Sequence, residues 1–161
     1  MNLRKIVAAP QMGVINRKDS LHKYFPLPKV VKFNWVNELN EHIAAKSDLN
    51  VKDEDGKTPL HIAVKWDNLN ALKILIEAKA DLNLQDKDGK SAVHIAVKWD
   101  NLNALKILIK AKADLNLQDK DGKSAVHRAV ECKNLDALKE LIKAKADLNL
   151  QDKDGKSAVH R

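Results

Sequence analysis

A stretch of 17 residues, AKADLNLQDKDGKSAVH, occurs three times without change, beginning at Ala78, Ala111 and Ala144. Each copy begins 33 residues after the previous one, and a divergent copy, AKSDLNVKDEDGKTPLH, begins 33 residues before the first, at Ala45. A period this regular is typical of a repeat array, in which each unit buries its apolar face only against its neighbours. We therefore expect a stack of repeated units.

The 33-residue period divides the chain into a tail and a repeat domain. Residues 1–21 show no helical or strand periodicity and are expected to form a basic, loosely ordered N-terminal tail. The repeat domain is expected over 22–161, with a degenerate unit at 22–54, full units at 55–87, 88–120 and 121–153, and a partial unit at 154–161. Because the last full unit lacks a complete partner, we expect fraying after about Leu150.

Within a unit the pattern predicts a turn, a short helix, a loop and a second helix. In the first full unit Thr58 is a suitable N-cap and Pro59 suits the first helical position, so the first helix is expected at about 59–66. The second helix is expected at about 70–79, where apolar residues recur at helical spacing. The turn Asp86-Lys87-Asp88-Gly89 is expected to project from the stack.

These residues resemble the ankyrin repeat, whose signature is a turn ending in Gly, then Thr-Pro-Leu-His-x-Ala, then two antiparallel helices closing on Ala-Asp-x-Asn. Here the signature reads DGKTPLHIA at 55–63, DGKSAVHIA at 88–96 and DGKSAVHRA at 121–129. The resemblance implies an all-α solenoid of stacked helix-turn-helix units with β-turn fingers. The motif residues it assigns to structure are Gly56, Thr58, Pro59, His61, Gly89, Ser91, His94, Gly122, Ser124 and His127.

The sequence departs from the family pattern at two glycine positions in each unit. Asp67, Asp100 and Lys133 stand between the two helices, and Lys79, Lys112 and Lys145 stand before the closing Ala-Asp. A non-glycine residue in the left-handed conformation costs about 1–2 kcal/mol. We expect reduced stability or altered helix ends at these positions, and the same fold.

Charge is unevenly distributed along the chain. The net charge is +7, and residues 1–33 hold seven Lys and Arg residues against Asp19 alone, which leaves only +1 for the other 128 residues. A basic face along the array, which binding to a nucleic-acid backbone would need, is therefore not supported. The basic tail leaves open an adaptor that binds nucleic acid or an anionic membrane, and deletion of residues 1–21 would test it.

Other sequence features bear on the compartment. No apolar run reaches the roughly 18 residues of a membrane span, and no secretory signal is recognised. The single cysteine, Cys132, excludes an intrachain disulfide framework and fits a reducing compartment. We expect a cytoplasmic or other intracellular location, with export by a route without a classical signal left open.

No catalytic, metal or nucleotide site is expected, and no cofactor. Gly89-Lys90-Ser91 resembles the end of a phosphate-binding loop, but position 84, five residues earlier, is leucine where that loop needs glycine. The recurring histidines could suggest a metal ladder, but stacked helices about 8–10 Å apart place them too far apart to share an ion. The resemblance instead implies that they bond backbone groups of neighbouring turns.

One row of residues does vary between units. Phe33, Trp66, Trp99 and Cys132 occupy the same repeat position, and in ankyrin repeats this position and the finger turns form the concave surface that contacts partners. Tryptophan is frequent in interface hot spots, but the indoles could instead only cover the loop of their own unit. The candidate partner-binding residues are Phe33, Lys65, Trp66, Gln85, Lys87, Asp88, Lys90, Lys98, Trp99, Gln118, Lys120, Asp121, Lys123 and Cys132.

The sequence thus predicts a non-enzymatic scaffold that binds a protein partner on its concave face. The adaptor acting through the tail is the alternative, and an array left by duplication without a partner is a third reading. The chain is expected to be a monomer unless its uncapped C-terminal end self-associates. Ankyrin repeats serve many ends, so the sequence does not name the partner or pathway.

Overall fold

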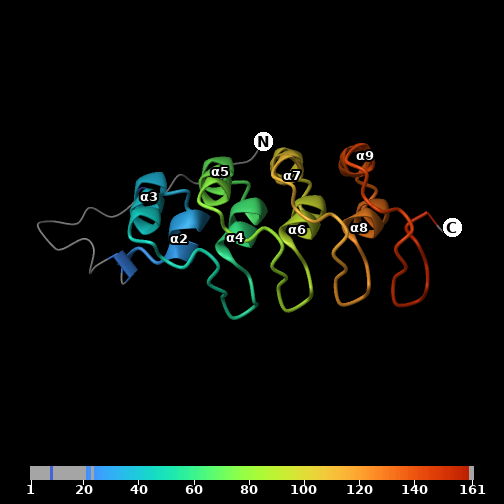
Figure 1. The fold of residues 1–161 in the computed structure, drawn as a ribbon, viewed down its shortest axis with the longest axis horizontal. Coiled ribbons are helices and arrows are strands. Elements are labelled where there is room, and N and C mark those ends of the chain that lie inside the picture. Colours follow the sequence, from blue (N-terminus) through green and yellow to red (C-terminus); the bar gives the residue numbers. More distant parts are fainter. Residues whose placement is uncertain (1–7, 9–20, 23, 160–161) are drawn as a thin grey trace, which may run out of the picture.

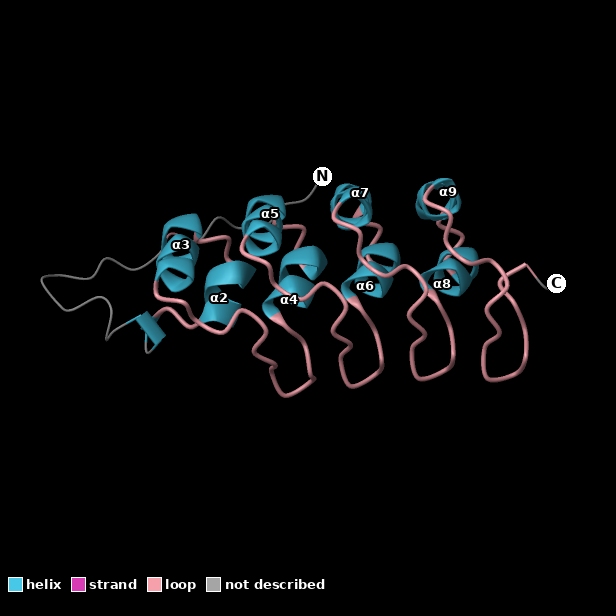
Figure 2. Cartoon of the chain, in the orientation of Figure 1, coloured by secondary structure: helices cyan, strands magenta, loops and turns pink. Residues whose placement is uncertain are grey.

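The computed structural model describes residues 8, 21, 22 and 24–159. Within these residues the chain forms four helix pairs that follow one another along the long axis, with no strand (Figure 1). First helices form one row, second helices form another, and loops project beyond the first row (Figure 2). This all-helical stack confirms the expected fold class. The helices are α2 Leu27–Lys32, α3 Val36–Ala44, α4 Pro59–Lys65, α5 Leu69–Glu77, α6 Ala92–Lys98, α7 Leu102–Lys110, α8 Ala125–Glu131 and α9 Leu135–Lys143.

The first helix of each full unit begins at a hydroxyl cap. Thr58 accepts a hydrogen bond from the backbone N–H of His61, and His61 Nδ1 accepts one from the backbone N–H of Thr58 at 3.1 Å. This reciprocal cap satisfies two N–H groups that a helix start would otherwise leave unpaired. Pro59 follows the cap as expected, at a position where no N–H is needed. The same cap starts α6 and α8, with the pairs Ser91–His94 and Ser124–His127.

Each helix from α2 to α9 is followed, one residue after its C-cap, by a non-glycine residue in the left-handed conformation, as the departures from the family pattern predict. Lys79 has a φ of 70°, and the next N–H, that of Ala80, donates to the carbonyl of Leu75. This closure ends α5 at Glu77, two residues before the expected end. The conformation recurs in every unit, at Asn34, Lys46, Asp67, Asp100, Lys112, Lys133 and Lys145.

Packing runs between units as well as within them. Each first helix contacts the first helix of the next unit, and the second helices do the same. Ala63 and Ala96 are buried in the first row, and Leu72 and Leu105 are buried in the second. A side chain in the middle of the array is therefore covered by its own unit and by a neighbour, which is the arrangement expected of a solenoid.

The projecting turns, which we call fingers, comprise residues 53–57, 86–90, 119–123 and 152–156. In the second finger the Asp86 carboxylate accepts the N–H groups of Asp88 and Lys90 at 2.9 Å each. Gly89 has a φ of 75°, and a Cβ there would lie 2.8 Å from the backbone nitrogen of Lys120 on the next finger. Glycine is required here by conformation and by close approach together.

The two ends of the chain differ in how far they can be described. Most of the predicted tail lies outside the described residues, although Leu21 is buried against the core. The fourth finger is described, and its Lys153 N–H donates to the carbonyl of Asp121 at 3.0 Å. Fraying after Leu150 stays a prediction for hydrogen exchange.

Candidate functional site

The predicted row lies at the ends of the first helices. Phe33, Trp66, Trp99 and Cys132 are the C-cap residues of α2, α4, α6 and α8. Phe33 packs against the core and stacks on Trp35 with ring centroids 5.4 Å apart. Trp66 is half-buried, Trp99 is 49% exposed and Cys132 is exposed. The row therefore becomes more exposed toward the C-terminal end.

Lysines connect the aromatic residues of this row across the units. The ammonium of Lys32 lies 5.0 Å from the ring centroid of Trp66 in the next unit, and that of Lys65 lies 5.6 Å from the centroid of Trp99. Each lysine also lies over the aromatic ring of its own unit. These distances fall within the range of cation–π attraction. We call the row the lysine–aromatic ladder; it consists of Lys32, Phe33, Lys65, Trp66, Lys98 and Trp99.

The ladder and the second finger share one hollow. Its volume is about 120 Å³, and four lysines and two aspartates give it a net charge of +2. Trp99 and Ile95 supply its apolar wall. The structure thus brings together five of the residues predicted from sequence: Lys65, Asp88, Lys90, Lys98 and Trp99. We call this the inner hollow, and its lining is Lys57, Lys65, Asp86, Asp88, Lys90, Ile95, Lys98 and Trp99.

One acid of the inner hollow is already neutralised. Asp86 Oδ2 lies 3.2 Å from the ammonium of Lys57, and the aspartate side chain is 1% exposed. Burial acts to raise the pKa of the Asp86 carboxyl, but hydrogen bonds from the Lys90 N–H and the Lys57 ammonium outweigh it and lower the pKa. The free charges of the hollow are therefore mostly cationic.

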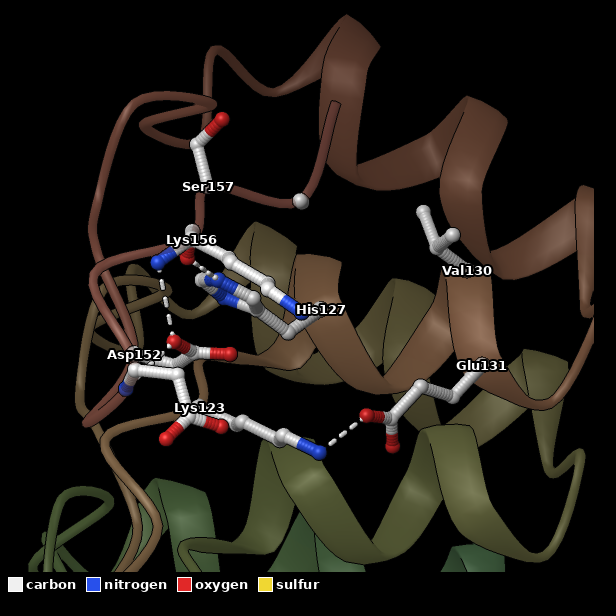
Figure 3. Close-up of a pocket in the computed structure, with 9 residues that line it drawn as sticks. Lys123, His127, Val130, Glu131, Asp152, Lys156 and Ser157 are labelled. Carbon is white, nitrogen blue, oxygen red and sulfur yellow. Dashed lines mark hydrogen bonds and ion pairs between the residues drawn. The ribbon is translucent and has the colours of Figure 1, made fainter. Parts of the chain in front are cut away.

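A second hollow lies one unit beyond the ladder, between α8 and the last finger (Figure 3). Its volume is about 450 Å³, and two lysines against three acids give it a net charge of −1. Figure 3 shows the Lys123 ammonium directed across the hollow to the Glu131 carboxylate, with which it pairs. Glu131, which lines this hollow, stands where the preceding unit has Lys98, and the next residue, Cys132, stands where it has Trp99. We call this the end hollow.

Arg128 replaces an isoleucine of the preceding unit and organises this end of the array. Its guanidinium lies 2.6 Å from the buried carboxylate of Asp119, and it also pairs with Asp121 and Glu131 at 3.0 Å each. Burial acts to raise the pKa of the Asp119 carboxyl, but hydrogen bonds from Arg128 and from the Lys123 N–H together with the Arg128 charge outweigh it and lower the pKa. Asp121 and Lys123, both predicted for partner contact, are thus engaged within the chain.

The motif histidines have the bracing role that the resemblance implies. Because a carbonyl only accepts, the 2.9 Å contact between His61 Nε2 and the carbonyl of Lys90 places the proton on Nε2. His61 Nδ1 accepts the Thr58 N–H, so the ring is neutral. Burial lowers the pKa of His61 and of His94. The same bond joins His94 to Lys123 and His127 to Lys156.

Two of the predicted partner-binding residues, Gln85 and Gln118, form hydrogen bonds between neighbouring fingers. The Gln85 side-chain amide donates to the carbonyls of Gly89 and Gln118, at 2.7 and 2.9 Å, and Gln118 repeats this with Gly122 and Gln151. These amides have their hydrogens committed within the array. The side chains of Lys87 and Lys120 are exposed on the fingers.

Sequence reasoning missed a second ladder, made of asparagines. Asn101 Nδ2 donates to the carbonyl of Val64 at 2.6 Å, and Asn68 and Asn134 donate in the same way to the preceding unit. Their recurrence every 33 residues is a signal that could have found them. It also missed the Arg128 ion pairs, although Arg128 is a cation where Ile62 and Ile95 stand in other units.

The described residues also bear on metal binding, membrane insertion and thiol chemistry. Among the described residues no three His, Cys, Asp or Glu side chains gather as a metal site would require. No helix in the described part of the chain is long and apolar enough to cross a membrane. The free thiol of Cys132 is exposed at the end of α8.

Comparison with protein families gives two matches. A family model described as "Ankyrin repeats (3 copies)" matches residues 29–119. Another, described as "Ankyrin repeats (many copies)", matches residues 108–161. The first match includes most of the degenerate unit at 22–54. No curated protein matches the chain.

Proposed function

The chain belongs to the ankyrin repeat family, and from this premise we propose that it is a non-enzymatic scaffold that binds a protein partner through the face shared by its first helices and fingers. Ankyrin repeats are generally protein–protein interaction modules. In this proposal the repeated caps, glycines and histidines hold the stack, and Phe33, Trp66 and Trp99 together with the fingers select the partner.

The lysine–aromatic ladder is the observation that carries the proposal. Trp99 is 49% exposed, and neither Trp66 nor Trp99 is among the buried residues of the core. An exposed indole is costly to leave in water and contributes strongly when a partner covers it. The cation–π contacts hold the indoles in place before binding, which reduces the entropy lost on association.

Affinity purification with the wild-type chain and the Trp66→Ala/Trp99→Ala variant tests the proposal. Loss of both indoles should weaken capture of the partner by more than about 2 kcal/mol, the scale of interface hot spots. Helicity should be retained, because neither indole fills the core. Ile142→Ala is the matched control, since Ile142 is 48% exposed on α9, outside the proposed face.

Unfolding of the double variant would contradict the proposal. If Trp66→Ala/Trp99→Ala unfolds the chain, the indoles serve to cover their own units and the proposal fails. The tail adaptor remains an alternative without support from the described residues. Deleting residues 1–20, which keeps the buried Leu21, should abolish binding and its salt dependence only if the tail carries the activity.

A further inference from the structure

We propose that the lysine–aromatic ladder and the inner hollow take an extended acidic segment of the partner protein, with one carboxylate per repeat unit. This inference rests on the proposed function, because it names the chemistry of the partner at the same surface. It does not follow from the family, since Lys32, Lys65 and Lys98 and the aromatic residues beside them lie outside the repeat signature.

The first observation is that the lysines of the ladder carry positive charge that no carboxylate neutralises within the described part of the chain. Within the described part of the chain none of Lys32, Lys65 and Lys98 forms an ion pair with a carboxylate. The inner hollow carries a net charge of +2, and its Asp86 is already bonded to Lys57. Asp100 lines a different hollow, which it shares with Lys98 and Cys132, and within the described part of the chain no ion pair joins it to Lys98. The ladder thus presents cations that a partner carboxylate can neutralise.

The rings themselves favour an acidic peptide over a nucleic acid. Base stacking needs an open aromatic face. Trp66 has the ammonium groups of Lys32 and Lys65 at 5.0 and 5.8 Å from its centroid, and Trp99 has those of Lys65 and Lys98 at 5.6 and 5.5 Å. A glutamate can pair with such an ammonium while its methylene groups contact the indole edge, without displacing the lysine.

The repeat spacing selects the register of the segment. Neighbouring packed helices lie about 8–10 Å apart, and a segment extended in the polyproline II conformation advances about 3.1 Å per residue with three residues per turn. About three residues of such a segment therefore span one unit and return the side chain to the same face, so carboxylates at every third position would each meet one lysine of the ladder.

The array also limits how far such a segment can extend. One unit beyond Lys98 the equivalent residue is Glu131, and one unit beyond Trp99 it is Cys132. The end hollow that contains Glu131 has a net charge of −1. A fourth carboxylate would meet like charge there, so the acidic segment should end, or continue with basic residues, after the third lysine of the ladder, Lys98.

Titration with synthetic peptides tests the proposal on the full chain, with tryptophan fluorescence as the readout. A peptide with glutamate at every third position should bind, and its affinity should fall as salt rises. A peptide of the same composition with its glutamates adjacent should bind several-fold more weakly. Equal binding of both peptides, or tighter binding of a single-stranded oligonucleotide, would overturn the proposal.

A matched pair of variants separates local recognition from net charge. Lys65→Gln/Lys98→Gln should weaken the spaced peptide by about 2–30-fold, the loss expected for two exposed ion pairs. Lys73→Gln/Lys106→Gln removes the same charge from exposed positions on α5 and α7 and should leave the affinity unchanged. Equal losses in the two variants would show that only the overall charge matters, and would contradict the proposal.

Adding a fourth lysine and aromatic residue to the ladder gives a test by gain of binding. Arg128→Ile/Glu131→Lys/Cys132→Trp gives the last full unit the residues of the unit at 88–120. A peptide with four spaced glutamates should then bind about 1.5–5-fold more tightly, the gain expected from one exposed ion pair, and a peptide with three should bind as before. No gain for the longer peptide in the folded variant would contradict the proposed register.

Failure of this inference can be told apart from failure of the proposed function. If acidic peptides do not bind but Trp66→Ala/Trp99→Ala still abolishes partner capture, the surface binds a protein of other chemistry. If neither peptide binding nor partner capture depends on the ladder, both proposals fail.

Discussion

The inner and end hollows are built from the same repeat and carry opposite net charge. The inner hollow, at +2, opens beside Trp99, whereas the end hollow, at −1, is crossed by the Lys123–Glu131 ion pair. The fingers are nearly identical in sequence, so the difference comes from the first helices: Glu131 stands in the end hollow where the inner hollow has Lys65, and the inner hollow also contains Lys98 of the next first helix. In the proposed function, a few variable residues on a constant scaffold therefore determine recognition.

Identical side chains also differ in burial between the inner units and the last full unit. Val97 and Leu105 are each 1% exposed, whereas Val130 and Leu138, at the same repeat positions, are only half-buried. Leu135 of the last full unit is 65% exposed. Because the described part of the chain holds no helix pair packed beyond α8 and α9, the position in the array determines burial. Matched substitutions in the two regions test this difference.

The largest difference is expected for buried leucines. Leu105→Ala should lower the free energy of unfolding by about 2–5 kcal/mol, the usual range for a buried leucine. Leu138→Ala should lower it by only about 1 kcal/mol, because the half-buried side chain loses less apolar contact on truncation. Urea denaturation measures both. Equal losses would show that a following unit does not determine the burial energy.

The finger glycines give the next contrast. Gly89→Ala should cost about 2–4 kcal/mol, since the new Cβ meets the next finger and the φ of 75° is strained. Gly155 has a φ of 77° but nothing within 4 Å of an added Cβ, so Gly155→Ala should cost only about 1–2 kcal/mol. Thermal or urea unfolding measures both losses in stability. Equal losses would show that contact with the next finger adds nothing to the cost at Gly89.

Left-handed lysines should instead behave alike in both regions. Lys112→Gly and Lys145→Gly relieve φ values of 68° and 63° and should each stabilise the chain by about 0.5–1 kcal/mol, after the entropy that glycine adds to the unfolded state. Lys106→Gly, inside α7, is the control and should destabilise by about 1 kcal/mol. Unequal gains at 112 and 145 would indicate that neighbouring units, and not only local strain, determine this effect.

Acid should destabilise the inner units through their histidines. Burial lowers the pKa of His61 and His94 in the folded chain, so below about pH 6.5 the unfolded chain binds more protons than the folded chain. Stability should therefore fall as the pH drops below 6.5. A further loss should follow below about pH 3.9, as Asp86 and Asp119, whose pKa values are lowered, become protonated.

The His94→Gln variant isolates the histidine contribution. Glutamine can donate to the Lys123 carbonyl but does not titrate, so the variant should be less stable at pH 7 and should lose less stability between pH 7 and 5. Urea midpoints across this range provide the measurement. An unchanged pH dependence would exclude His94 as a contributor.

Local sequence signals predicted most of the scaffold. The caps at Thr58 and Ser91 and the positive φ of Gly89 and of Lys79 are properties of single units that recur with the 33-residue period. The histidine brace joins neighbouring units and was expected only from the family resemblance. Contacts across units were harder to foresee. Neither the lysine that lies over the next unit's tryptophan nor the Arg128 pair with Asp119 follows from one unit's pattern, because each depends on how neighbouring units are placed.

The most direct test of the account compares two residues at one repeat position. The partner recovered with the wild-type chain should bind Trp99→Ala at least about 30-fold more weakly, as expected for loss of a hot-spot indole. It should bind Cys132→Ala, altered at the equivalent position where the ladder has ended, within about twofold of wild type, with urea midpoints unchanged in both. Equal binding by Trp99→Ala and Cys132→Ala would contradict the claim that recognition lies on the lysine–aromatic ladder.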